Sequence, residues 1–119
     1  MPAGFFKPAH TPLFYTSSSH LKMNKKYNHY KVTLEHIYSP ANEDLHRRVE
    51  VVFDNHDNLF NIIDLMQQKD LFGDMGQSTE FAIGLKMMGE VMLKNKDNAL
   101  FDEFMPAFKD FMNKLKASY

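Results

Sequence analysis

YKVTLEHIY, residues 30–38, alternates apolar and polar side chains, and LHRRVEVVF, residues 45–53, repeats that alternation in the returning direction. A period of two residues is typical of a β-strand that buries one face. The stretch between them, SPANED at 39–44, has the composition of a turn. The sequence therefore predicts an antiparallel hairpin.

The register of the hairpin follows from matching the faces of its strands. Setting Tyr38 opposite Leu45 brings apolar residues together on one face and opposite charges together on the other. The predicted pairs are Leu34–Val49, Val32–Val51, Tyr30–Phe53 and Glu35–Arg48. A shift by one residue would mix the faces. The polar face, expected in solvent, carries Lys31, Thr33, Glu35, His46, Arg48 and Glu50.

A first helix is expected from about His56 to Lys69, where apolar residues recur at helical spacing. Asp54 or Asn55 is the predicted N-cap, and Asp57 is expected in the first turn, where its charge complements the helix dipole.

Two further helices are predicted after a loop at 71–77. Ser78 is the expected N-cap of the second helix, whose wide apolar coverage indicates a central position. The third helix contains Pro106. Because proline is poorly tolerated inside a helix, either a kink near Asp102–Met105 or a fresh helix starting at Pro106 is expected. The predicted fold is α+β: a two-stranded antiparallel hairpin packed on three C-terminal helices.

Composition limits the class of protein. The chain has 119 residues, 44% of them hydrophobic and 24% charged, which is typical of one globular domain. It contains no cysteine, so disulfides and thiolate metal sites are excluded. A net charge of −1 gives no reason to expect nucleic-acid binding. No apolar run approaches the roughly 20 residues that span a membrane, so the cytoplasm is the expected location.

Residues 1–22 differ from the rest of the chain, with three prolines, a serine run and no periodicity. We expect them to form a flexible extension or to result from an upstream mis-start, because Met23 opens a segment that resembles a translational start. The alternative is that their apolar side chains pack back on the domain. Residues 23–119 are expected to form a single α+β domain.

Several motifs occur in one order along residues 27–116: Asn55-His56-Asp57, a Gly84-Leu85-Lys86 run ending in Gly89-Glu90-Val91, and Pro106-Ala107-Phe108. In this respect the chain resembles a small family of bacterial conserved domains of unknown function, about 90–100 residues long with the order β-β-α-α-α. The resemblance implies a fold and supplies no activity.

One candidate site uses nitrogen and oxygen ligands. The predicted register places His29 near Asp54, from which the chain continues to His56 and Asp57. Two imidazoles and two carboxylates suit Zn, Ni or Mn. No two histidines have the spacing of a helical metal pair, however, and capping and turn roles explain Asn55, His56 and Asp57 better than a metal site does.

Other candidate positions are His36, which is predicted opposite Arg47, and two glycines of the second helix. His36 suits a general base or a pH switch, but a partly buried ring bonded to backbone or to a carboxylate such as Glu43 explains it better. Gly84 and Gly89 each weaken a helix, which indicates either close packing or a ligand beside them.

No catalytic residue and no cofactor are predicted. We expect a non-enzymatic protein-interaction or regulatory module. The alternatives are a metal-binding protein or small enzyme using His29, Asp54, His56 and Asp57, and a binder of an apolar small ligand near Gly84 and Gly89. Because a two-stranded sheet has two open edges, we also expect a homodimer formed by edge pairing.

Overall fold

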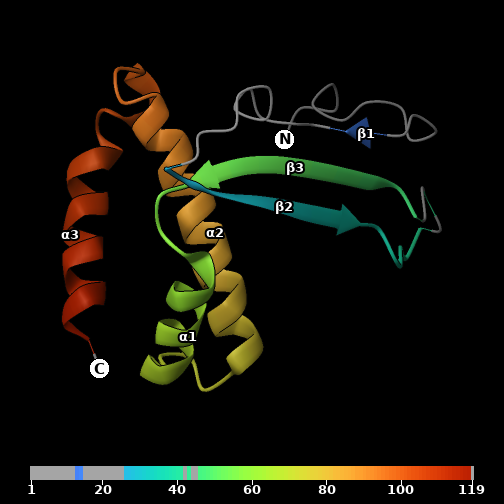
Figure 1. Ribbon diagram of the computed structural model, residues 1–119, viewed down its shortest axis with the longest axis horizontal. Helices are drawn as coiled ribbons and strands as arrows, with labels where there is room; N and C mark the ends of the chain where they lie inside the picture. Colours follow the sequence, from blue (N-terminus) through green and yellow to red (C-terminus); the bar gives the residue numbers. More distant parts are fainter. Residues whose placement is uncertain (1–12, 15–25, 42, 44–45, 119) are drawn as a thin grey trace. The chain divides into compact units, whose positions relative to one another are not determined.

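The structure, a computed structural model, describes residues 13–14, 26–41, 43 and 46–118. The described strands precede three α-helices and one short 3-10 helix (Figure 1). The chain divides into two compact units, Met1–His56 and Asp57–Tyr119. The predicted α+β class is confirmed, because an antiparallel strand pair is followed by helices in the expected order.

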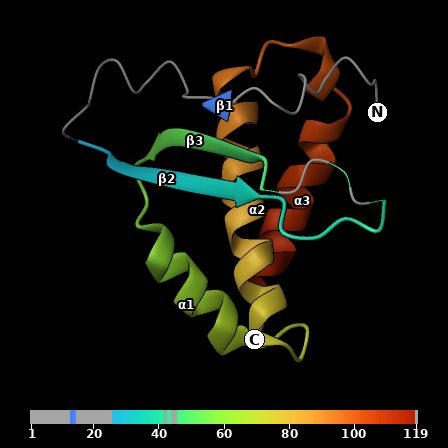
Figure 2. The ribbon, with the colours of Figure 1, turned by 90° about the vertical axis from the view of Figure 1, so that its right-hand side faces the viewer.

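Strands β2 (Asn28–Glu35) and β3 (Arg48–Asn55) form the predicted hairpin (Figure 2). All four predicted pairs are confirmed, from Glu35–Arg48 to Tyr30–Phe53. Both strands extend further toward the open end of the hairpin than predicted and stop earlier toward its loop. The predicted pair of Tyr38 with Leu45 lies outside the described residues.

A β-bulge separates the hairpin ladder from its loop. The His46 N–H donates to the His36 carbonyl at 2.6 Å, and the His36 N–H donates to the Arg47 carbonyl at 2.9 Å. Two consecutive residues therefore oppose one, and the first of them, His46, has a φ of 70°. This is the pattern of a bulge whose first residue is left-handed. It explains why β2 and β3 end at this point.

The apolar face of the hairpin is buried at only one end. Phe53 is 4% exposed and Val32 is half-buried, whereas Leu34 is 71% exposed. The expectation that Leu34 is buried is therefore wrong. Alternation assigns a side chain to a face of a strand, but it does not determine whether anything covers that part of the face.

A short strand, β1 (Leu13–Phe14), pairs in parallel with β3, so the sheet order is β1-β3-β2. The two-stranded prediction missed this third strand, because two residues carry no periodicity. The rest of the predicted extension, residues 1–12 and 15–22, lies outside the part of the chain that is described. Within the described part, β3 is central and β2 has an outer edge with no strand beside it.

Helix α1 (Leu59–Lys69) begins after Asn58, whose side-chain oxygen accepts from the Phe60 N–H at 3.0 Å. The predicted caps, Asp54 and Asn55, are the last residues of β3 instead. Asp57 also precedes the cap and does not lie in the first turn of the helix. The true cap is the polar residue immediately before the first apolar residue of the helix, in agreement with the usual preference.

Helix α2 (Met75–Lys94) begins after Asp74, whose carboxylate accepts from the Gln77 N–H at 3.0 Å. The prediction of Ser78 as the cap is therefore wrong. Ser78 lies within the first turn and is only 1% exposed. The helix starts earlier than predicted because Asp74 is a good cap and the helix tolerates Gly76 in its first turn.

The predicted break in the last helical segment is confirmed. A 3-10 helix, η3 (Ala99–Phe101), is followed by α3 (Phe104–Ala117). Pro106 therefore lies in the first turn of α3, where the missing N–H has no partner in the helix.

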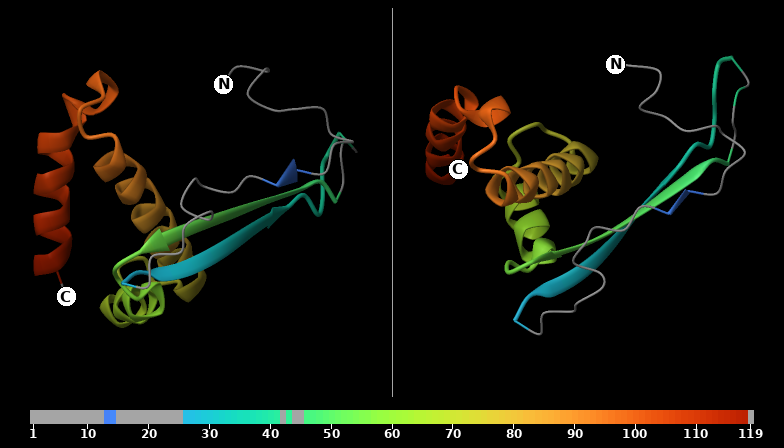
Figure 3. Two further views of the ribbon diagram at one scale, coloured as in Figure 1. Left: turned by 45° about the horizontal axis from the view of Figure 1, so that its top comes forward. Right: turned by 90° about the horizontal axis from the view of Figure 1, so that it is seen from above.

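Figure 3 shows the ribbon of the three α-helices from two further directions. Side chains from all three helices form one core within residues 57–118. Met66 of α1, Ala82 of α2 and Leu115 of α3 are buried together. The half-buried side chains packed around them are Ile62, Ile63, Phe81, Leu85 and Met112. Met88 and Val91 of α2 are exposed, so the apolar coverage of this helix exceeds what the core buries.

Candidate functional site

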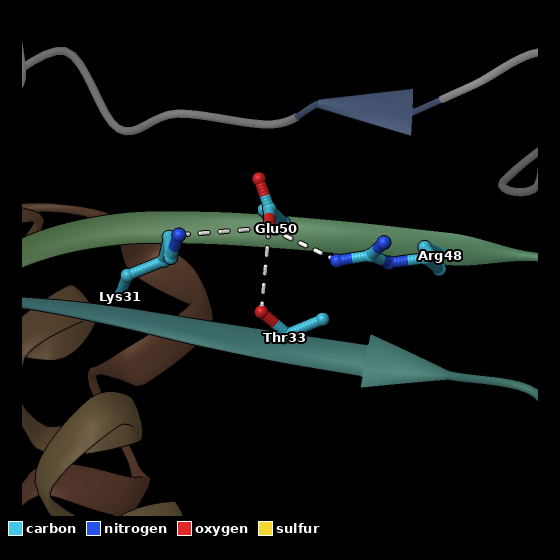
Figure 4. Close-up of polar contacts among 4 residues, drawn as sticks. All are labelled: Lys31, Thr33, Arg48 and Glu50. Carbon is cyan, nitrogen blue, oxygen red and sulfur yellow. Dashed lines mark hydrogen bonds and ion pairs between the residues drawn. The ribbon is translucent and has the colours of Figure 1, made fainter.

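The polar face of the hairpin is organised around one carboxylate (Figure 4). Glu50 of β3 accepts a hydrogen bond from Arg48 at 3.3 Å, lies 3.8 Å from the Lys31 ammonium and accepts from the Thr33 hydroxyl at 3.5 Å. Its side chain is 16% exposed, whereas Lys31 and Arg48 are more than half exposed. The cluster places two cations and one hydroxyl around a single carboxylate and joins the two strands.

A second polar contact joins the end of β2 to the bulge. The His46 Nδ1 lies 3.2 Å from a carboxylate oxygen of Glu35, and the two side chains are 76% and 43% exposed. Both residues were expected on the solvated face of the hairpin, but their contact was not predicted. The bulge brings His46 back toward Glu35. The sequence did not indicate a bulge here, because glycine is the usual residue at such a position.

The bulge also determines which backbone groups of β2 face outward. Because the His36 N–H is directed at β3, the alternation of an antiparallel ladder directs Leu34 and Val32 the same way. The N–H and C=O groups of Lys31, Thr33 and Glu35 therefore face the outer edge. This edge can accept a further strand.

Exposed apolar side chains lie beside this edge, where β2 ends. Leu34, Ile37 and Tyr38 are 71%, 76% and 74% exposed. Leu34 also lines an open hollow of about 280 Å³. Its lining is Leu34, Glu35, His36, Arg47 and Val49. A concentration of large apolar side chains in solvent is typical of a binding surface.

The candidate residues His36 and Arg47 are thus brought together, through their backbones and as neighbours in the lining of the hollow. The His36 side chain is exposed. The expectation of a partly buried ring bonded to backbone or to a carboxylate is therefore wrong. Arg47 is half-buried.

The structure does not bring the four candidate metal ligands, His29, Asp54, His56 and Asp57, together into a metal site. His29 pairs with Asp54 as predicted, and Asp54 is buried. The His56 ring makes an edge contact with Tyr27, and the Asp57 carboxylate accepts from Lys86 at 2.6 Å. Within the described residues, no group of three or more histidine, aspartate or glutamate side chains could hold a metal ion.

The two glycines of α2 have different surroundings. Gly84 has no atom within 4 Å of the place where a Cβ would lie, and it lines an open groove of about 670 Å³. The other lining residues are Phe72, Gln77, Glu80, Phe81, Leu85 and Met88. Gly89 instead faces the Phe108 ring at 3.9 Å, an ordinary packing distance. Only Gly84 therefore belongs to a candidate ligand surface.

None of the helices in the described part of the chain is long and apolar enough to cross a membrane.

Comparison with known proteins gives a family without an activity. A search of curated proteins finds no match. A crystal structure of a protein of unknown function (eca1910) from Pectobacterium atrosepticum SCRI1043 is similar, with 32% identity and a TM-score of 0.67. The similarity covers 76% of this chain and 97% of that one. The family model for a domain of unknown function with a solved structure, DUF3861, matches residues 28–117. The expected resemblance is confirmed, and the chain belongs to the DUF3861 family.

Proposed function

We propose that this domain is a non-enzymatic protein-interaction module, acting in the cytoplasm, that binds its partner along the outer edge of β2. The observation that carries the proposal is the exposure of Leu34, Ile37 and Tyr38 beside an edge that no described strand covers. A strand that adds to such an edge gains backbone hydrogen bonds, while the neighbouring apolar side chains supply buried area and specificity.

The polar residues of the hairpin also favour binding over chemistry. Glu50 is held by Lys31 and Arg48, and Glu35 is near His46, so these carboxylates are engaged in cross-strand contacts. The Thr33 hydroxyl donates to Glu50 at 3.5 Å, but Lys31 and Arg48 contact the same carboxylate. We therefore assign this contact to cross-strand pairing and not to the activation of a nucleophile.

Affinity capture from a native bacterial lysate tests the proposal when two matched baits are used. The wild-type chain is compared with Thr33→Pro, which removes an outward N–H and leaves the bonds of β2 to β3 in place. We expect proteins that the wild type retains to be lost from the variant. Val32→Pro is the control for folding, because it removes a bond to β3 and lowers the stability of the hairpin.

Retention of the same proteins by the wild type and by a folded Thr33→Pro variant would contradict an edge-binding module. So would the absence of any specific partner, including a second copy of the chain.

A second candidate function is binding of an apolar small ligand in the groove beside Gly84. The groove favours it because Phe72 and Met88 are both more than 40% exposed there, with Gln77 available for a polar group. Thermal-shift measurements with fatty acids of increasing chain length test this function. A stabilisation that is lost in Gly84→Leu and kept in Gly89→Ala would support it, and no shift with any chain length would reject it.

A further inference from the structure

The outer edge of β2 is self-complementary in its backbone. The outward groups belong to Lys31, Thr33 and Glu35, so an antiparallel second β2 must place these odd-numbered residues opposite odd-numbered residues. A two-fold axis through Thr33 satisfies this condition, because Thr33 then meets the same residue of the second copy in a hydrogen-bonded pair.

The charges on the edge select this register over its neighbours. With the axis at Thr33, Lys31 faces Glu35 of the second copy, and the symmetry repeats the pair. Axes at Val32 and at Leu34 also place odd-numbered residues opposite odd-numbered residues, but Thr33 then faces Lys31 or Glu35 and the opposite charges no longer meet. With the axis at Lys31 or at Glu35, two like charges would meet at the centre. Lys31 is 60% and Glu35 is 43% exposed along their side chains, so both can reach across the edge.

The opposite face of the strand agrees with the same register. Val32 then lies beside Leu34 of the second copy, and the pair also occurs twice. Leu34 is 71% exposed in the single chain, far more than the other apolar residues on this face of β2. Pairing would remove it from water and stabilise the association.

We propose that β2 pairs antiparallel with β2 of a second copy about a two-fold axis at Thr33, which rests on the proposed function of the edge and names its partner. The resulting sheet has the strand order β1-β3-β2-β2-β3-β1, in which β1 already pairs with the other edge of β3. The Glu50 cluster stays intact, because Lys31 lies between Glu50 on its own sheet and Glu35 of the second copy.

A charge-exchange experiment tests the pairing by sedimentation equilibrium over a concentration series. The wild type is expected to pass from the mass of one 13.9 kDa chain to twice that mass. Lys31→Glu and Glu35→Lys each bring like charges together twice, so each alone should weaken dimerisation by about tenfold or more. An equimolar mixture of the two variants restores both attractive pairs and should dimerise, as should the double variant.

The controls separate dimerisation from folding. Thermal unfolding followed by circular dichroism is measured for each variant, and Lys109→Glu is the matched reversal of an exposed lysine on α3, expected to leave the dimer unchanged. Lys31→Glu could lose its fold through repulsion from Glu50. In that case the pairing is tested by comparing the dimerisation of Glu35→Lys with that of Glu35→Gln, because only Glu35→Lys brings a second positive charge opposite Lys31 of the other copy.

A wild type that stays at the mass of one chain overturns the pairing, and so does a mixture that dimerises no better than its components. Neither result rejects edge binding by itself: a different protein captured by the wild type and lost with Thr33→Pro would keep the proposed function while the pairing fails.

Discussion

Lys86 donates to Asp57 with a distance of 2.6 Å between Nζ and Oδ2, connecting the segment before α1 to the middle of α2. The side chains are 22% and 37% exposed, so the pair is partly shielded from solvent. A charge-assisted hydrogen bond in this setting is stronger than a pair at the surface. Asp57, which precedes the Asn58 cap of α1, is thus bound to α2.

Replacing Lys86 with methionine should therefore lower the free energy of unfolding by about 1 kcal/mol. The matched control is Lys94→Met, which breaks a contact of 3.7 Å with Glu90 one turn earlier on the same helix. Such helical pairs contribute about 0.3–0.5 kcal/mol. Urea unfolding measures both variants, and equal losses would contradict the special role of the Asp57 contact.

The correction of the α2 cap gives a second prediction. Asp74→Ala should destabilise the protein by about 1 kcal/mol, because the Gln77 N–H loses its acceptor. Ser78→Ala should be neutral or stabilising, since the Ser78 hydroxyl is buried and makes no hydrogen bond among the described residues. Thermal unfolding of the two variants decides. A larger loss for Ser78→Ala would restore Ser78 as the cap.

Replacing either of two glycines with alanine should change the free energy of unfolding, but in opposite directions. Gly84 has a helical position with open space around it, so Gly84→Ala should stabilise the protein by up to about 1 kcal/mol. Gly73 has a φ of 67°, a conformation that disfavours a side chain, so Gly73→Ala should destabilise by about 1 kcal/mol. Chemical denaturation of both variants is the measurement, and a destabilised Gly84→Ala would show packing that the structure does not contain.

Zinc titration tests the metal hypothesis for His29, Asp54, His56 and Asp57. We expect no saturable heat in isothermal calorimetry, because the described residues hold no cluster of three ligands and Asp57 is bound to Lys86. Saturable heat that disappears in both His29→Ala and His56→Ala would establish the site.

The hairpin register could be predicted because two segments of alternating apolar and polar residues can match their faces in few ways. Leu34 shows the limit of that argument, since the pattern correctly placed it opposite Val49 and wrongly implied its burial. The bulge at His46 was not predictable, because it depends on a left-handed backbone, which only a few per cent of non-glycine residues adopt.

The predictions of the helix caps were wrong for a different reason. Asp54, Asn55 and Asn58 are all good caps, and their identities alone do not show where the strand stops. The candidate edge was also missed, although Lys31 and Glu35 are visible in the sequence. Lys31 and Glu35 can be recognised as residues of an open edge, placed symmetrically about Thr33, only when the hydrogen bonds of the ladder show which backbone groups face outward.

Amide hydrogen exchange of the full chain, followed residue by residue by NMR at low and high protein concentration, tests the outer edge of β2 most directly. The amides of Lys31, Thr33 and Glu35 should exchange rapidly when dilute and slowly when concentrated, while Val32 and Leu34, bonded to β3, stay protected in both conditions. Exchange of the three outward amides that is independent of concentration would contradict self-pairing at this edge.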